Sequence, residues 1–251
     1  MNEKSNMKNI NIVIPSGGLG TRFSGSEFVE LKPFIKFFGK TMFEWLLIGF
    51  NSKKYNISFF IIINEKFRNI YSEDIKNLED NYQVKFKYIN LLTEGTTATA
   101  LFLFDELNNS TPTLLANCDQ IIDMNFDDYL DEHFSKDADG SMLCFDKEDS
   151  NKWSFVRVDE NNKIIEVRAK ENITDIAICG WYFWTKGSDF IKYGIEQIIN
   201  LDRVGNEYYL CPVFNYAIKN NKKIIAIIID KAKMHGIGTP EDLRKYLALK
   251  D

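Results

Sequence analysis

Short apolar runs alternate with amphipathic stretches through the first half of the chain. Strongly apolar runs bounded by turn residues are typical of strands buried on both faces of a parallel sheet. The amphipathic stretches have the spacing of helices, and Thr41 suits the N-cap of the first one. The strands expected in this half cover residues 10–14, 34–38, 57–63, 84–88 and 113–116, and the helices cover 42–51, 72–80 and 96–107. This alternation predicts an α/β fold with a mostly parallel, doubly wound sheet that binds ligands at the carboxyl ends of its strands.

The second half has a less regular pattern, with more strands and fewer helices between them. A hairpin turn is expected at residues 159–162. Thr239 suits an N-cap and Pro240 the first position of a C-terminal helix. The strands expected here cover residues 140–145, 153–158, 163–167, 176–184 and 223–229, and the helices cover 187–200, 207–219 and the residues after 239. Because the chain shows no linker, repeat or low-complexity segment, we interpret residues 1–251 as a single domain.

A glycine-rich turn follows the first apolar run. It reads Ser16-Gly17-Gly18-Leu19-Gly20-Thr21-Arg22, and Lys32 comes ten residues after the arginine. Glycines let the main chain approach a ligand where a Cβ would collide. Bare N–H groups form an anion-binding concavity, and an arginine with a lysine supplies positive charge. The pattern therefore predicts a triphosphate-binding loop; the alternative is a tight strand-to-helix turn with a solvated Arg/Lys pair.

This run, together with Lys32-Pro33, resembles the signature of nucleotidylyltransferases that activate sugar phosphates and related small phosphates. It is neither a Walker loop nor a dinucleotide fingerprint. The resemblance extends from Ile12 to Leu243 and implies the nucleotide-diphospho-sugar transferase fold. It divides the domain into an NTP-binding half, about residues 8–125, and an acceptor-binding half, about residues 126–251. The NTP contacts that it implies are Ser16, Gly17, Gly18, Gly20 and Thr21 in the loop, with Arg22 and Lys32 on the phosphates.

Two further stretches of the first half carry candidate residues. Gly95 and Thr96 open a predicted helix with small side chains, which leaves main-chain groups open to a flat ligand. The resemblance assigns them to the nucleotide base; the alternative is an ordinary helix start with a threonine cap. Asp119 follows an apolar strand and is well placed to hold Mg²⁺ near a triphosphate, as the resemblance also implies. The alternative is an aspartate that starts a turn, and Asp123 is a second, weaker candidate.

Candidate acceptor-binding residues lie in the second half. Lys170 matches the family's lysine for the acceptor phosphate, whereas Ala169 replaces the glutamate that contacts a sugar; on its own, Lys170 would be an ordinary exposed lysine. Gly180 lies in an aromatic strand that resembles a pocket-lining strand of the family and also suits the core. Glu207 resembles an acceptor contact, or starts a helix. His235 could contact a phosphate or be a satisfied structural histidine.

A second metal ligand is missing from its expected place. Gly236 stands where sugar nucleotidylyltransferases often carry an aspartate. Either Mg²⁺ takes one protein carboxylate with phosphates and water, or Asp230 or Glu207 substitutes.

Composition limits the compartment and the partners. The formal net charge of −5 gives no general affinity for nucleic acid or anionic membranes. The four cysteines are widely spaced without a Cys-x-x-Cys motif, which favours reduced thiols in the cytoplasm. Residues 1–9 lack the apolar core of a signal peptide, and no run is long enough to span a bilayer. Association as a homodimer is left open.

The expected reaction joins an NTP, with CTP as first choice, to a phosphorylated small molecule and releases pyrophosphate. A narrower resemblance, carried by residues 117–120, 206–209 and 235–240, is to the CTP:phosphoglutamine cytidylyltransferases of capsule loci. A hexose- or heptose-1-phosphate nucleotidylyltransferase is the alternative.

Two other classes stay open. A metal-dependent glycosyltransferase would be expected to show Asp-x-Asp, where Asn117 stands. A non-catalytic nucleotide-binding regulator would bind NTP without turnover.

Overall fold

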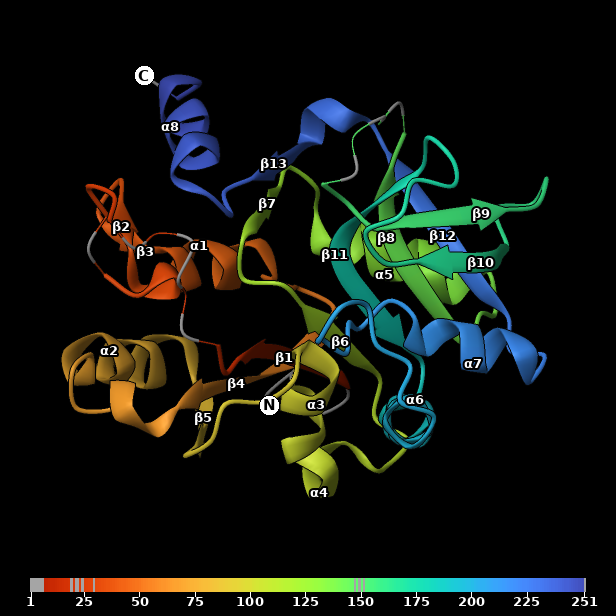
Figure 1. Ribbon diagram of the computed structural model, residues 1–251, viewed down its shortest axis with the longest axis horizontal. Coiled ribbons are helices and arrows are strands. Elements are labelled where there is room, and N and C mark those ends of the chain that lie inside the picture. Colours follow the sequence, from red (N-terminus) through yellow and green to blue (C-terminus); the bar gives the residue numbers. More distant parts are fainter. Residues whose placement is uncertain are drawn as a thin grey trace.

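A nine-stranded sheet forms the centre of the protein (Figure 1). The computed structural model describes residues 7–18, 20, 23, 25–28, 30–146, 148, 150 and 152–250 of the chain. The strand order is β10-β9-β11-β6-β1-β4-β5, with β8 beside β11 and β12 beside β8. The strands are β1 (Lys8–Ser16), β4 (Tyr55–Asn64), β5 (Val84–Ile89), β6 (Thr113–Ala116), β8 (Gly140–Phe145), β9 (Phe155–Val158), β10 (Ile164–Arg168), β11 (Ala177–Trp184) and β12 (Ile224–Ile229).

The sheet is mostly parallel, as the sequence predicts. Strand β1 pairs in parallel with β4 and β6, and β4 pairs in parallel with β5. In the second half β12 runs parallel to β8. Strand β11 runs antiparallel to β6 and β8, and β9 and β10 form the expected hairpin. Strand β11 therefore joins the two halves of the chain into one sheet.

Helices cover both faces of the sheet, which is the doubly wound arrangement. Alternate residues of β1 show why: Ile12 packs into one apolar layer and Val13 into the opposite one. One layer contains α1 (Met42–Gly49), α2 (Ser72–Tyr82) and α5 (Phe126–Ser135); the other contains α3 (Thr96–Ala100), α4 (Phe104–Leu107), α6 (Gly187–Ile199) and α7 (Val213–Lys219).

A third, smaller apolar cluster brings the C-terminal helix against the β2–β3 hairpin of the first half. Helix α8 (Pro240–Ala248) packs against the short hairpin of β2 (Lys36–Phe37) and β3 (Lys40–Thr41). The rings of Tyr246 and Phe37 meet edge to face at 6.1 Å. In Figure 1 the blue α8 accordingly lies beside the orange β2. Thr239 caps α8 by accepting a hydrogen bond from Asp242 N at 3.2 Å, as expected.

Three predictions about the elements are wrong in detail. The helix expected at 96–107 is divided into α3, the 3₁₀ helix η5 (Leu101–Leu103) and α4. Thr99 Oγ1 donates to Gly95 O at 2.9 Å, and such a bond back to the preceding turn bends helices. The helix expected from Glu207 begins only at Val213, because the main chain of Tyr208 is hydrogen-bonded to the start of α3. The strand expected at 34–38 is shortened to the two-residue β2, because Phe34 still belongs to the 3₁₀ helix η3 (Lys32–Phe34).

Several short elements and one helix were not predicted. Among them are α5, the short strand β7 (Gln120–Ile122) and its partner β13 (Met234–Gly236). The last two pair in antiparallel register outside the main sheet. Within the described part of the chain, no helix has the length and apolar character needed to cross a membrane. All four cysteines are free thiols.

Candidate active site

The candidate site begins where β1 and β6 end. Because these strands are parallel neighbours, Ser16 and Ala116 bring both carboxyl ends to the same edge of the sheet. The chain leaves β1 through Gly17, where a Cβ would lie only 2.9 Å from Ile89 Cδ1. Beside Gly18 the space is open: no described atom lies within 4 Å of the place of a Cβ. The main chain at Gly18 is therefore accessible to a ligand.

The glycine-rich turn leads to a buried ion pair. Gly20 has a φ of 64°, and a Cβ there would lie 3.3 Å from Lys32 N, so the turn packs against the segment that carries the lysine. Lys32 Nζ lies 2.8 Å from Asp119 Oδ2, and the two side chains are only 15% and 12% exposed. The structure thus brings together the predicted phosphate lysine and the predicted metal carboxylate. Thr21 and Arg22 lie outside the described residues.

The β7–β13 ribbon encloses Asp119 from the other side. Its pairing places Gly236 opposite Gln120, directly after the aspartate. Ile237 N donates to Asp119 O at 2.9 Å. A Cβ on Gly238 would lie 2.7 Å from Asp119 Oδ2, so only a glycine leaves the carboxylate in place. The late Gly-Ile-Gly stretch is therefore part of the carboxylate's immediate surroundings.

Asp119 suits a cation that arrives with phosphates. Within the described part of the chain, no group of three or more His, Cys, Asp or Glu side chains could hold a metal ion by itself. Mg²⁺ is commonly bound by one or two carboxylates together with substrate phosphates and water. A buried carboxylate that faces a lysine and an open glycine turn fits such shared coordination. It does not fit a cage made of protein ligands alone.

The residues considered as a second metal ligand have other surroundings. Asp230 is the N-cap of the 3₁₀ helix η6 (Lys231–Lys233), where its carboxylate accepts a main-chain hydrogen bond at 2.8 Å. Asp123 Oδ2 lies 2.8 Å from His235 Nε2. Glu207 is exposed on a tight turn. His235 therefore has a protein partner in Asp123.

A segment of the second half docks on the start of α3. Gly95, the N-cap, has a φ of 110°, and a Cβ there would lie 2.5 Å from Tyr208 N. Tyr208 N donates to Glu94 O at 2.7 Å, and Thr97 N donates to Tyr208 O at 3.0 Å. These bonds explain why the helix expected from Glu207 starts later. They also place Tyr208 next to Gly95 and Thr96, the predicted base-binding residues.

The predicted acceptor residues are only partly brought together. Lys170 has a φ of 59°; its Nζ donates to Lys152 O at 2.7 Å and lies 6.0 Å from the centre of the Tyr209 ring. Gly180 lies in β11 and has a φ of 82°. A side chain there would collide with the residues on either side of Asp119. Glu207 is exposed and its main chain pairs with Val204, whereas its neighbour Tyr208 docks on the start of α3.

Burial keeps two further groups of the site neutral. Burial raises the pKa of the Tyr182 hydroxyl well above its ordinary value, and a hydrogen bond with Asn117 opposes this only in part. Burial also raises the pKa of the Cys118 thiol, against the opposing charge of Lys32. At neutral pH both groups therefore remain protonated.

Some residues of the site could not be found from the sequence. The docking of Tyr208 uses only main-chain atoms, so its side chain gives no signal. Gly238 had a signal, because it lies in the distinctive stretch His235-Gly236-Ile237-Gly238-Thr239, but its contact with Asp119 depends on the unpredicted β7–β13 pairing.

This combination of a doubly wound sheet, a glycine turn and a strand-end carboxylate is found in enzymes that act on nucleotides. The sequence from residue 11 to residue 248 matches the family described as Nucleotidyl transferase, and the chain belongs to that family. A comparison with curated proteins gives no match.

Solved structures share the fold over almost the whole chain. The nucleoside-diphosphate-sugar pyrophosphorylase from Vibrio cholerae superimposes with a TM-score of 0.79 and 20% identity, covering 94% of this chain and 99% of the other. The inositol-1-phosphate CTP transferase from T. maritima gives 0.74 and 17%, covering 96% and 94%. The CTP:phosphocholine cytidylyltransferase from Streptococcus pneumoniae gives 0.75 and 16%, covering 97% and 100%. At these identities the similarity establishes the fold.

Proposed function

We propose that the protein transfers a nucleotidyl group from an NTP to the phosphate of a small acceptor and releases pyrophosphate. The observation that carries this proposal is the largely buried Lys32–Asp119 pair at the carboxyl ends of β1 and β6, where the segment of Lys32 packs against Gly20 of the glycine turn. An acceptor phosphate oxygen attacks the α-phosphorus in line and forms the new P–O bond. The bond from the α-phosphorus to its bridging oxygen breaks, and pyrophosphate leaves with the electron pair. Such a reaction depends on positioning and on charge neutralisation.

The contact of Lys32 with Asp119 supports the roles of these two residues, and the sequence motifs supply the other roles. Lys32 and Arg22 hold the triphosphate, and Asp119 holds Mg²⁺, which neutralises charge on the phosphates. In the free protein Lys32 neutralises Asp119; with nucleotide bound, it turns to the phosphates. Lys170 binds the acceptor phosphate. The remaining proposed contacts are Ser16, Gly17, Gly18, Gly20 and Thr21 for the NTP, Gly95 and Thr96 for the base, and Gly180, Glu207 and His235 for the acceptor.

CTP and phosphoglutamine are the proposed substrates, in the synthesis of capsule or surface polysaccharide precursors in the cytoplasm. Ala169 offers no carboxylate to a sugar hydroxyl. Gly236 stands where sugar nucleotidylyltransferases often carry an aspartate, and a Cβ there would lie 3.1 Å from the Trp153 ring. Both features favour an acceptor other than a sugar. Two of the structural neighbours are described as CTP-using enzymes, which is compatible with this choice. The pyrophosphorylase neighbour favours the second candidate, a hexose- or heptose-1-phosphate nucleotidylyltransferase that makes an NDP-sugar.

A pyrophosphate-release matrix tests the proposal. Four NTPs are each combined with phosphoglutamine, phosphocholine and several sugar 1-phosphates in the presence of Mg²⁺. We expect release with one NTP and one acceptor class, and product identification by mass spectrometry separates the two candidates. NTP binding without pyrophosphate release from any mixture would instead identify a nucleotide-binding regulator. Release of a nucleoside diphosphate from an NDP-sugar would identify a glycosyltransferase.

A further inference from the structure

Two carboxamides lie beside the carboxylate of Asp119. A Cβ on Gly180 would lie 2.5 Å from Gln120 Oε1 and 2.7 Å from Asn117 Nδ2. Both amides therefore occupy the space that a side chain at Gly180 would take. Gly180 also has a φ of 82° and its O accepts from Asn117 N at 3.0 Å, at the point where the β11–β8 register shifts. The irregular backbone of β11 makes room for this pair of amides.

The amide oxygen of Gln120 lacks the hydrogen bond that a buried acceptor requires. Gln120 is only 8% exposed, and its Oε1 is buried without a hydrogen-bond partner in the described part of the chain. A buried polar atom in this state costs about 1–3 kcal/mol, and native structures contain few of them. Asn117, in contrast, is bonded to the hydroxyl of Tyr182. We therefore expect a bound ligand to supply the hydrogen-bond partner of Gln120 Oε1.

The position of Gln120 indicates which ligand that is. Gln120 follows Asp119 directly, and Asp119 is the proposed holder of the ion at the phosphates. The acceptor phosphate must approach the α-phosphorus in line, so the body of the acceptor lies close to this carboxylate. Gln120 and Asn117 come from the end of β6 and the start of β7, and Gly180 comes from β11 of the second half. The amides therefore lie at the junction where the proposed acceptor half meets the nucleotide half.

We propose that Gln120, supported by Asn117, selects the acceptor by its hydrogen bonds. This inference rests on the proposed nucleotidyl transfer and defines its acceptor class. The unpartnered atom is the carboxamide oxygen of Gln120, which accepts hydrogen bonds, so its complement is a group that donates one. A carboxamide or a sugar hydroxyl meets this requirement. A trimethylammonium group has neither a donor nor an acceptor and is recognised instead by aromatic faces, so phosphocholine is excluded.

The test compares the wild type with Gln120→Met, which keeps the length and removes the amide. We measure the melting temperature and the KM for acceptor and NTP, with phosphoglutamine, glucose 1-phosphate and phosphocholine as acceptors. The acceptor KM is expected to rise about 10-fold or more, in keeping with the loss of a buried hydrogen bond, while the NTP KM stays within about 2-fold. The melting temperature should be unchanged or higher, because the chain itself gives Gln120 Oε1 no partner.

A buried polar residue elsewhere supplies the matched control. Ser141 Oγ lies 2.8 Å from Tyr129 Oη and 3.0 Å from His133 Nδ1, and Ser141 pairs with Phe183 rather than with Gly180 on β11. Ser141→Ala should lower the melting temperature and leave the acceptor KM unchanged. If the KM for phosphoglutamine rises in Gln120→Met, a carboxamide of the acceptor supplies the hydrogen-bonding group. If the KM for glucose 1-phosphate rises, a sugar hydroxyl supplies it.

Three results would overturn the inference. An unchanged acceptor KM in Gln120→Met, with wild-type turnover intact, refutes the role of Gln120 and leaves the proposed function standing. Efficient turnover of phosphocholine by the wild type refutes the acceptor class. Absence of pyrophosphate release by the wild type from every mixture refutes the proposed function, and the inference fails with it.

Discussion

Lys32 and Asp119 are separated by 87 residues in the sequence, yet their side chains form a 2.8 Å ion pair. Each could be predicted as a site residue from its own motif. Their contact could not, because it depends on the strand order that places β6 beside β1. A buried ion pair is weak evidence for stability, since desolvation offsets much of the attraction. The position of the pair at the ends of two neighbouring strands is better explained by a role in binding a phosphate and a metal ion.

Gly238→Ala tests how tightly the site holds Asp119. The new Cβ would lie 2.7 Å from Asp119 Oδ2, the mobile end of a side chain, so the carboxylate moves and the fold is kept. We expect turnover to fall about 10-fold or more, since an ångström of misplacement can cost about 100-fold. Gly49→Ala is the matched control, because the end of α1 has no described neighbour within 4 Å of its Cβ position. Equal activities of the two variants would contradict the role given to Gly238.

His133 should make the stability depend on pH. It is buried between Ser141 and Thr185, and burial lowers its pKa from 6.5 to about 4, with the charge of Lys8 adding to the effect and Asp139 opposing it. The folded protein keeps His133 neutral, whereas the unfolded chain takes up a proton below about pH 6.5. Stability is therefore complete above that pH and is lost as the pH falls towards 4. The loss is about 3 kcal/mol at most, at 1.36 kcal/mol per pKa unit.

Denaturant unfolding at pH 7 and pH 4.5 checks this prediction. In His133→Gln the difference in the free energy of unfolding between the two pH values should shrink. Gly49→Ala, whose new methyl group has no described neighbour within 4 Å, is the control and should retain the wild-type difference. The prediction fails if His133→Gln and the wild type lose the same free energy.

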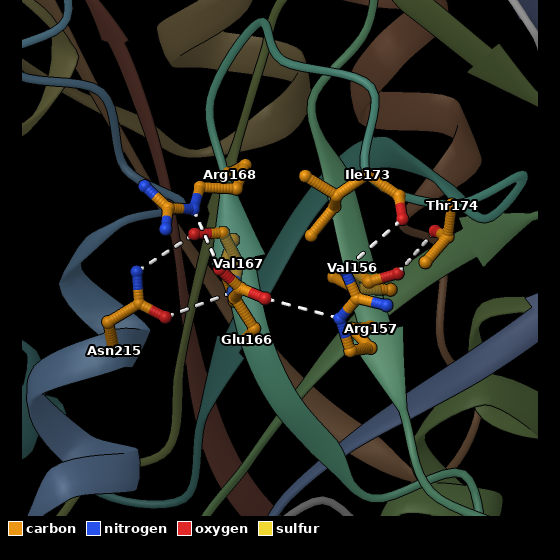
Figure 2. A network of polar contacts seen from close by, with 8 residues as sticks. All are labelled: Val156, Arg157, Glu166, Val167, Arg168, Ile173, Thr174 and Asn215. Carbon is orange, nitrogen blue, oxygen red and sulfur yellow. Dashed lines mark hydrogen bonds and ion pairs between the residues drawn. The ribbon is translucent and has the colours of Figure 1, made fainter.

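At the scale of elements, a single side chain closes the free edge of the β9–β10 hairpin. Asn215 of α7 accepts from Val167 N at 3.0 Å and donates to Val167 O at 2.9 Å, as a neighbouring strand would (Figure 2). On the same strand, Glu166 lies between Arg157 and Arg168, and these ion pairs are exposed to solvent. The hydrogen bonds of Asn215 and the ion pairs of Glu166 hold the same strand in different ways, so their contributions to stability can be compared directly.

Asn215→Ala should destabilise the fold and loosen the hairpin that leads to Lys170. Leaving the N–H and C=O of Val167 without partners costs about 1–3 kcal/mol. We also expect the acceptor KM to rise more than the NTP KM, because Lys170 follows β10 while the glycine turn is untouched. Glu166→Gln should change the free energy of unfolding by no more than about 1 kcal/mol, since exposed ion pairs contribute little. A larger loss of stability in Glu166→Gln than in Asn215→Ala would contradict this comparison.

Elements with a clear sequence pattern could be predicted well, and those that depend on distant contacts could not. The strands at 113–116 and 140–145 were predicted to the residue, because uninterrupted apolar runs between turn residues leave little choice. Helix α5 carried a readable signal, with an Asn125 cap and buried residues at Phe126, Tyr129, Leu130 and His133. The late start of α7, in contrast, is imposed by main-chain bonds to α3 that no local pattern contains.

For the whole molecule, the site belongs to both halves of the chain. The first half supplies the glycine turn, Lys32 and Asp119. The second half supplies Gly180 on β11, Gly238 after β13 and the segment that docks on α3. The family and the fold class could be predicted from the sequence because the glycine turn has a specific composition. The order of the strands could not, since β11 enters beside β6 through long-range pairing.

Pyrophosphate release by the wild type and by Asp119→Ala tests the central claim most directly. Both proteins are assayed with the productive NTP and acceptor from the matrix, at saturating Mg²⁺, after circular dichroism has shown that the variant is folded. The account predicts pyrophosphate release by the wild type and a loss of about 100-fold or more in Asp119→Ala, because a charge-stabilising group at the transition state is removed. Full activity of a folded Asp119→Ala protein would contradict it.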